Sequence, residues 1–113
     1  MISNNNSVES YDNMIISFSK PFHLLIRQKS FSDIFAYRKF LNWVSGEFDL
    51  NLQDKSDNLK IFFPNKRLSI SKLERQNNCI ISEIKIEAIS IPNGMILLSS
   101  IESIYLNLIK NLQ

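Results

Sequence analysis

Apolar and polar residues alternate with a period of two in the middle of the chain, which predicts β-strands there. Residues 59–63 form a short apolar run, and residues 67–71 read Arg-Leu-Ser-Ile-Ser. Pro64 and Asn65 lie between the two runs, and these residue types favour a turn. We therefore interpret residues 59–71 as a β-hairpin.

Two further regions carry strand signals. Residues 14–18 and 22–26 are rich in β-forming residues, and Pro21 between them indicates either one interrupted strand or a short hairpin. Residues 80–91 hold an excess of isoleucine, with Glu83, Lys85 and Glu87 alternating with apolar residues. That alternation is typical of a strand with one buried and one solvated face. The apolar positions then change parity at Ile89, which predicts a β-bulge.

A first helix is predicted at approximately 31–47, where apolar residues recur at helical spacing. Ser30 and Asp33 before it resemble a capping box, with an acidic residue in place of the usual Glu or Gln. The main apolar stripe consists of Ile34, Phe35, Leu41, Val44 and Phe48. We expect this stripe to lie against a sheet.

A second helix is predicted at approximately 100–112. Ser99 and Glu102 form a capping box, and Pro92-Asn93-Gly94 before them is a turn signal. One apolar stripe runs through three turns of this helix: Ile101, Ile104, Tyr105, Leu108, Ile109 and Leu112. Such a stripe must be buried against another element.

The order of these elements predicts one α+β domain of two layers. Residues 1–12 are polar and lack periodicity, so we expect a flexible N-terminal tail followed by a single domain over residues 13–113. Residues 49–58 are predicted to be a loop. We expect a mostly antiparallel sheet with both helices packed on one of its faces.

The composition of the chain excludes several classes of function. The chain has 113 residues, of which only two are glycine, and it lacks the motifs of Walker and dinucleotide-binding loops. We therefore expect no nucleotide cofactor and no small-molecule substrate. No apolar run reaches the ~20 residues that span a bilayer, and the N-terminus does not resemble a signal peptide. A cytoplasmic location and no membrane span are expected.

Cys79 and His23 are the only cysteine and the only histidine in the chain. A catalytic cysteine needs a base nearby, and a zinc site needs several such ligands. The sequence offers neither arrangement locally, so we interpret Cys79 as a small buried residue and His23 as a structural or surface residue. We expect no metal and no enzyme, although the two residues could form a site across an oligomer interface.

The net charge of +2 comes from one segment. Residues 60–75 carry five basic residues against one acidic residue, a net charge of +4. The basic residues are Lys60, Lys66, Arg67, Lys72 and Arg75. Together with Phe62 and Phe63 they could contact phosphates and stack on bases of RNA or DNA. The parity of the strand predicts that Phe62 faces outward with Lys60, and that Phe63 faces inward.

The first helix has a second group of apolar residues, Tyr37, Phe40 and Trp43, away from the main stripe. A two-layer domain covers one side of each helix, so we expect these three to form an exposed protein interface. The favoured hypothesis is a non-enzymatic protein-interaction or assembly module, a small subunit of a homo- or hetero-oligomer. The alternative is an RNA- or DNA-binding accessory protein that uses the basic hairpin.

Overall fold

The sheet and two helices form the two predicted layers. A computed structural model describes residues 8–11, 14–76 and 79–111. The elements are β1 (Val8–Tyr11), β2 (Met14–Ser19), β3 (Phe22–Phe31), α1 (Ile34–Glu47), β4 (Leu52–Asp54), β5 (Leu59–Phe63), β6 (Lys66–Gln76), β7 (Cys79–Ala88) and α2 (Ile91–Asn111). The seven described strands form one antiparallel sheet in the order β1-β2-β3-β7-β6-β5-β4. The predicted α+β class is confirmed.

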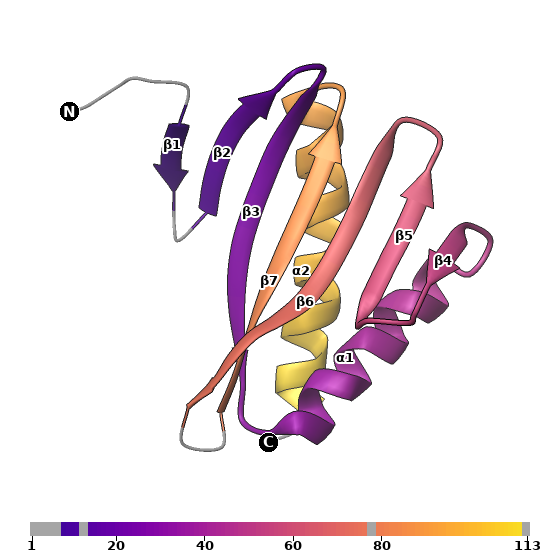
Figure 1. Ribbon diagram of the computed structural model, residues 1–113. Helices are drawn as coiled ribbons and strands as arrows, with labels where there is room; N and C mark the ends of the chain where they lie inside the picture. The colour runs from indigo at the N-terminus through magenta and orange to yellow at the C-terminus, as the bar shows by residue number, and fades with distance from the viewer. Residues whose placement is uncertain (1–7, 12–13, 77–78, 112–113) are drawn as a thin grey trace.

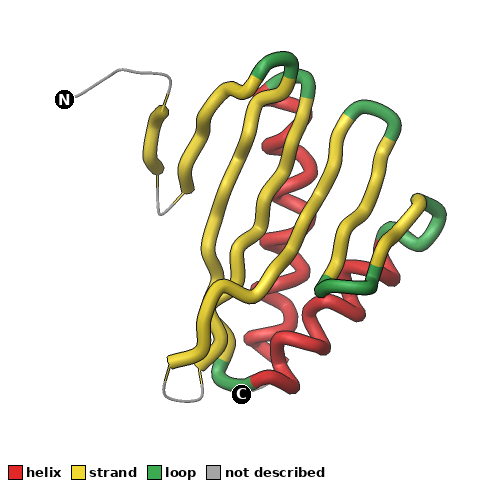
Figure 2. The backbone as a smooth tube through the Cα atoms, in the orientation of Figure 1, coloured by secondary structure: helices red, strands yellow, loops and turns green. Residues whose placement is uncertain are grey.

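Both helices cover the same face of the sheet (Figure 1). Helix α2 contacts β3 and β7 at the centre, and α1 contacts β3, β5 and β7. The chain passes from β3 through α1 to the far edge at β4, then returns strand by strand until β7 pairs with β3. Figure 2 shows the two helices behind the sheet and no described segment in front of it. One face of the sheet is therefore left open.

Strand β7 follows the predicted alternation. Ile84, Ile86 and Ala88 are fully buried toward the helices, whereas Glu83, Lys85 and Glu87 lie on the opposite side and are half-buried. The predicted bulge near Ile89 is wrong, because the strand ends at Ala88 and the chain leaves the sheet there. The change of parity marks the transition to α2. An irregular register occurs instead in β6, between Lys72 and Glu74.

The hairpins come from local turn chemistry. Pro64 and Asn65 connect β5 and β6 as predicted, and Lys20 and Pro21 form the turn between β2 and β3. The hairpin interpretation of Pro21 is thus the correct one. Strand β4 lies in the predicted loop, so that expectation is wrong for Leu52–Asp54. Strand β1 lies within the stretch for which the sequence carries no periodicity, and residues 1–7 and 12–13 are outside the described residues.

Helix α1 begins three residues later than predicted, because Phe31 still belongs to β3. Asp33 is the N-cap, and its side chain accepts a hydrogen bond of 2.9 Å from the backbone N–H of Ala36. Such a cap satisfies a backbone donor that has no partner within the helix. At the other end, the Phe48 N–H donates to the Val44 carbonyl at 3.3 Å.

The side of α1 that faces the sheet differs from the prediction. Tyr37 is 2% exposed and Phe40 is 0% exposed, whereas Phe35 of the predicted stripe is 74% exposed. Trp43 is half-buried and packs against the core. The expected exposed interface of Tyr37, Phe40 and Trp43 is therefore wrong for its first two members. The ring of Phe40 lies 5.1 Å from that of Phe31 and 6.0 Å from that of Tyr105, and these cross-element contacts select the buried side.

Helix α2 begins at Ile91, nine residues earlier than predicted, so the interpretation of Pro92-Asn93-Gly94 as a turn is wrong. Proline suits the first turn of a helix, where its missing N–H needs no partner. The Ser90 hydroxyl accepts a hydrogen bond from the Asn93 N–H at 3.3 Å, and the Gly94 N–H donates to the Ser90 carbonyl at 3.1 Å. The predicted stripe continues through Ile101 and Leu108, which are both buried. Leu112 is outside the described residues.

Candidate functional site

The uncovered side of the sheet is the largest surface that the described elements leave without a second layer; we call it the open face. Its residues alternate with the core residues of the same strands. They include Ile15 of β2, Phe22, Leu24 and Ile26 of β3, Glu83, Lys85 and Glu87 of β7, Arg67, Ser69 and Ser71 of β6, Lys60 and Phe62 of β5, and Leu52 and Asp54 of β4. The strand register places them in rows that run across the sheet.

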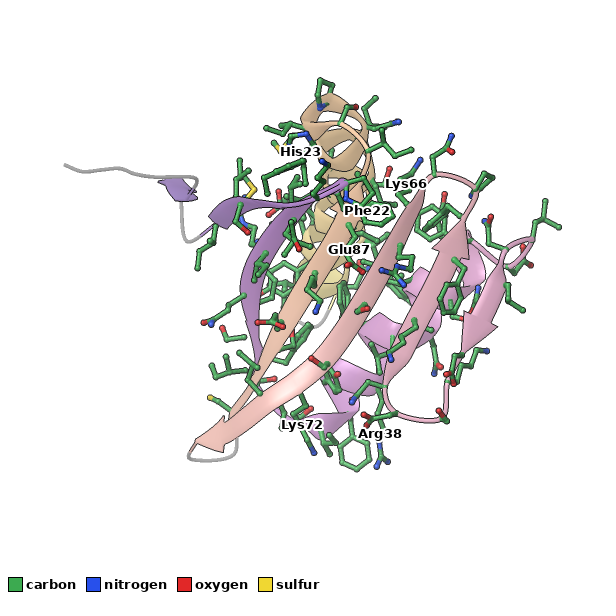
Figure 3. The ribbon with its side chains drawn as sticks, turned by 45° about the horizontal axis from the view of Figure 1, so that its top comes forward. Phe22, His23, Arg38, Lys66, Lys72 and Glu87 are labelled. Carbon is green, nitrogen blue, oxygen red and sulfur yellow. The ribbon has the colours of Figure 1, made fainter. Side chains whose placement is uncertain are left out.

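Arg67 is held between two partners on the open face. Its Nη2 lies 3.0 Å from Oε1 of Glu87 on β7, and its guanidinium lies 5.5 Å from the centre of the Phe22 ring on β3. Figure 3 shows Phe22 and Glu87 at the same end of the sheet. The cluster links β3, β7 and β6, and it neutralises the charge of Arg67 within the chain.

Apolar side chains occupy the part of the open face on β2 and β3. Ile15 pairs in register with Ile26, and Leu24 pairs with Glu87. Ile15 is 41% exposed, while Leu24 and Ile26 are half-buried although no described element covers them. These side chains cover one another only in part, so a further partner could still remove apolar area from water.

A shallow depression of about 400 Å³ lies on the charged part of the open face. Its floor includes Ser69 and Ser71 of β6, and longer side chains such as Lys60, Glu83 and Lys85 stand around it. The depression forms because two short serine side chains are flanked by long ones on β5 and β7. Period two in the sequence already indicates that both serines face away from Leu68 and Ile70, but the pairing with β7 could not be predicted.

The five basic residues of the predicted nucleic-acid contact do not form one patch. Lys60 and Arg67 lie on the open face. The predicted outward direction of Lys60 and Phe62 is confirmed. Lys66 has the register of the helix side, and its Nζ lies 5.4 Å from the centre of the Phe63 ring. Lys72 is exposed at the opposite end of β6 from Lys66 (Figure 3). The side chain of Arg75 is outside the described residues.

His23 and Cys79 do not meet within the chain. His23 pairs in register with Ala88, at one end of β7, and Cys79 begins the other end. Nine residues of strand separate these ends, a distance of about 30 Å. Cys79 is exposed, so its interpretation as a buried residue is wrong. The His23 ring contacts the Phe18 ring at 4.8 Å. Within the described residues, no three His, Cys, Asp or Glu side chains are arranged to hold a metal ion.

Two ionisable groups near the β4–β5 connection have altered pKa values. Burial, reinforced by the negative charge of Asp57, raises the pKa of Tyr37 to about 12. The Tyr37 hydroxyl donates a hydrogen bond of 2.8 Å to Oδ1 of Asn58, whose φ of 70° is one that asparagine tolerates. Hydrogen bonds from the hydroxyl and N–H of Ser56 lower the pKa of Asp54. Tyr37 is buried on the helix side of the sheet, whereas Asp54 pairs in register with Lys60 and lies at the β4 edge of the open face.

An ion cluster on the helix side was not predicted. Oε2 of Glu102 lies 2.8 Å from Nε of Arg27 and 3.0 Å from Nζ of Lys29. The sequence assigned Glu102 to a capping box, but the residue lies in the middle of α2 and links it to β3. Only the packing of α2 on the sheet brings these three residues together.

Comparisons with known proteins do not add to this geometry. No family model, curated protein or solved structure matches the chain. Neither α1 nor α2 combines the length and apolar character needed to cross a bilayer.

Proposed function

We propose that this protein is a non-enzymatic protein-binding module, a small subunit of a larger assembly, that docks through the open face of its sheet. One observation carries the proposal: a complete face of the sheet has no second layer among the described residues, yet it presents Ile15, Leu24 and Ile26 to solvent. Antiparallel sheets often have one solvated face, but that face is then mainly polar. Apolar residues beside charged ones are typical of a protein interface.

The remaining chemistry supports recognition over catalysis. The nucleophilic Cys79 and the basic His23 are held at opposite ends of β7, and Arg67 is neutralised by Glu87. The proposal includes a cytoplasmic location, supported by the single cysteine, since proteins of oxidising compartments commonly pair their cysteines.

The experiment compares substitutions on the two sides of the molecule. Ile26→Lys changes the open face, and the matched control Ile96→Lys changes α2, where Ile96 is 69% exposed. Proteins bound in the native host are cross-linked, and the cross-linked positions on this chain are mapped by mass spectrometry. We expect cross-links on β3, β6 and β7 that Ile26→Lys removes and Ile96→Lys retains. Cross-links confined to the helices, or insensitive to Ile26→Lys, would contradict the proposal.

A nucleic-acid partner is the second candidate, because Lys60, Phe62 and Arg67 share the open face. Asp57, Glu83 and Glu87 line the same depression and would repel phosphates, so a protein partner is favoured. Lys60→Ala should weaken the binding of a single-stranded oligonucleotide and reduce its salt dependence if the second candidate is correct. The absence of binding at low salt would eliminate it.

A further inference from the structure

The charges around the depression are arranged as two poles. Lys60 of β5 and Lys85 of β7 both pair in register with Ser69, one from each side. Arg67 is two residues away along β6 and lines the same depression. The depression is therefore positive near Ser69.

The other end of the depression is negative. Glu83 pairs in register with Ser71, and Asp57 lines the depression two residues before β5 begins. Because β5 and β6 are antiparallel, residues preceding Leu59 lie toward the Ser71 end. Positions two residues apart on a strand are separated by about 7 Å, so the positive and negative poles are adjacent.

Only part of the charge at the two poles is balanced within the chain. Arg67 is paired with Glu87 at 3.0 Å. Lys60 lies opposite Asp54, its register partner on β4, and the two charges attract one another. Among the described side chains, Lys85 at one pole and Glu83 at the other make no ion pair. The Asp57 carboxylate accepts a hydrogen bond of 3.0 Å from the side chain of Asn58. A partner with the opposite arrangement of charges would therefore find Lys85 at one pole and Glu83 at the other without an ion-pair partner among the described side chains.

A second copy of the chain has that arrangement. A two-fold axis that runs across the strands, between Ser69 and Ser71, reverses the order of the poles in the facing copy. It brings Lys85 of one copy to Glu83 of the other, and Lys60 to Asp57, with each contact made twice. Facing sheets are separated by about 10 Å, which pairs of Lys and Glu side chains can bridge.

The area of the open face is sufficient for such a contact. The central strands β3, β6 and β7 have 10, 11 and 10 residues, whereas β1, β2, β4 and β5 have three to six. Each residue covers about 3.3 Å along its strand and about 4.8 Å across the sheet. The projected area is therefore on the order of 800 Å², comparable with the roughly 800 Å² that each partner buries in a stable complex. The same contact covers Ile15, Leu24 and Ile26.

We propose that the protein forms a two-fold symmetric dimer through its open face, with Lys85 and Lys60 of each copy paired with Glu83 and Asp57 of the other. The proposal rests on the proposed function and names the partner as a second copy.

The test uses charge reversal in the full chain. Glu83→Lys and Lys85→Glu each place like charges opposite one another in the dimer, so each variant should dimerise about 10- to 100-fold more weakly than the wild type. Sedimentation across micromolar concentrations measures the dissociation constant. Glu47→Lys and Lys110→Glu, at exposed positions on the helices, are the matched controls and should dimerise as the wild type does.

An equimolar mixture of the two open-face variants decides the geometry. The Lys85→Glu variant carries two negative side chains at positions 83 and 85, and the Glu83→Lys variant carries two positive ones. The mixture should therefore form a mixed dimer. The double variant Glu83→Lys/Lys85→Glu should dimerise with itself again. Native mass spectrometry distinguishes the mixed dimer if one variant is isotope-labelled.

Two results would overturn the dimer. One is a wild-type protein that stays monomeric at high concentration, and the other is a set of single variants that dimerise as tightly as the wild type. A monomeric protein whose cross-links to another host protein still map to β3, β6 and β7 would leave the proposed function intact while removing the dimer. A monomeric protein that also lacks cross-links on β3, β6 and β7 would contradict the dimer and the proposed function together.

Discussion

The helix side and the open face of the sheet are made from alternating residues of the same strands, but they carry different chemistry. Ile84 and Ile86 on the helix side are fully buried, and the intervening Lys85 is only half-buried on the open face. The helix side is stabilised by apolar burial and ring contacts around Phe31 and Phe40. Within the part of the chain that the structure describes, the open face combines the Arg67–Glu87 ion pair with Lys85 and Glu83, which make no ion pair, and with partly exposed aliphatic side chains. One side of the sheet therefore forms the core, and the other is left without a covering layer by the described elements.

The largest expected difference between the faces concerns two neighbouring leucines of β3. Leu25 is 1% exposed beneath α2, and Leu24 is half-buried on the open face. Leu25→Ala should lower the free energy of unfolding by about 2–5 kcal/mol, because it removes apolar contacts and leaves a cavity. Leu24→Ala should cost about 1 kcal/mol or less in the monomer. Urea unfolding of both variants measures the contrast, and equal losses would show that the open face is also core.

The next largest effect is a pH dependence of the free energy of unfolding, caused by Tyr37 on the helix side. The pKa of Tyr37 is raised from 10.0 to about 12 in the folded protein, first by burial and then by Asp57. Below pH 10 both states keep the proton; between pH 10 and 12 the unfolded state loses it while the folded state does not. Stability should therefore fall by about 2–3 kcal/mol as the pH rises through this range.

Tyr37→Phe is the control for this pH dependence. The substitution removes the hydrogen bond to Asn58, and this loss should lower the free energy of unfolding by about 1 kcal/mol at neutral pH. The substitution also removes the ionisable hydroxyl. The unfolding free energy of the variant should fall less steeply than that of the wild type between pH 10 and 12. Parallel curves for the two proteins would assign the loss to other groups.

The smallest expected effect is the difference in stability that the ion pairs of the two faces contribute. Glu102 bridges Arg27 and Lys29 on the helix side, where the three side chains are 16–24% exposed. Glu102→Gln should destabilise the protein by about 1–2 kcal/mol, because the two cations are left close together. Glu87→Gln should cost less than about 0.5 kcal/mol, since Arg67 is 47% exposed and water replaces its partner. Measurements of the free energy of unfolding at low and high salt compare the two variants. A larger loss of stability for Glu87→Gln than for Glu102→Gln would contradict this prediction.

Part of the candidate site was predictable because strand parity is a local property. The outward direction of Lys60, Phe62 and Glu83 follows from alternation with residues that must be buried, whatever the neighbouring strand is. Which strands lie side by side is not local. The two poles exist only because β6 is paired with β5 on one side and β7 on the other. No spacing in the sequence brings Lys60 and Lys85 to the same serine.

The sequence by itself determined the α+β class, the β5–β6 hairpin, the alternation of β7 and the apolar stripe over Ile101 and Leu108, since each depends on neighbours within a few residues. The tertiary structure decided the rest. Both sides of α1 are apolar, so docking on the sheet, through rings contributed by Phe31 and Tyr105, decided that Phe40 is buried and Phe35 exposed. The close packing of α2 on β3 uses Gly94, where a Cβ would lie 3.0 Å from Cδ1 of Leu25. Local patterns specify which residues need burial, but only long-range packing specifies what buries them and which face remains open.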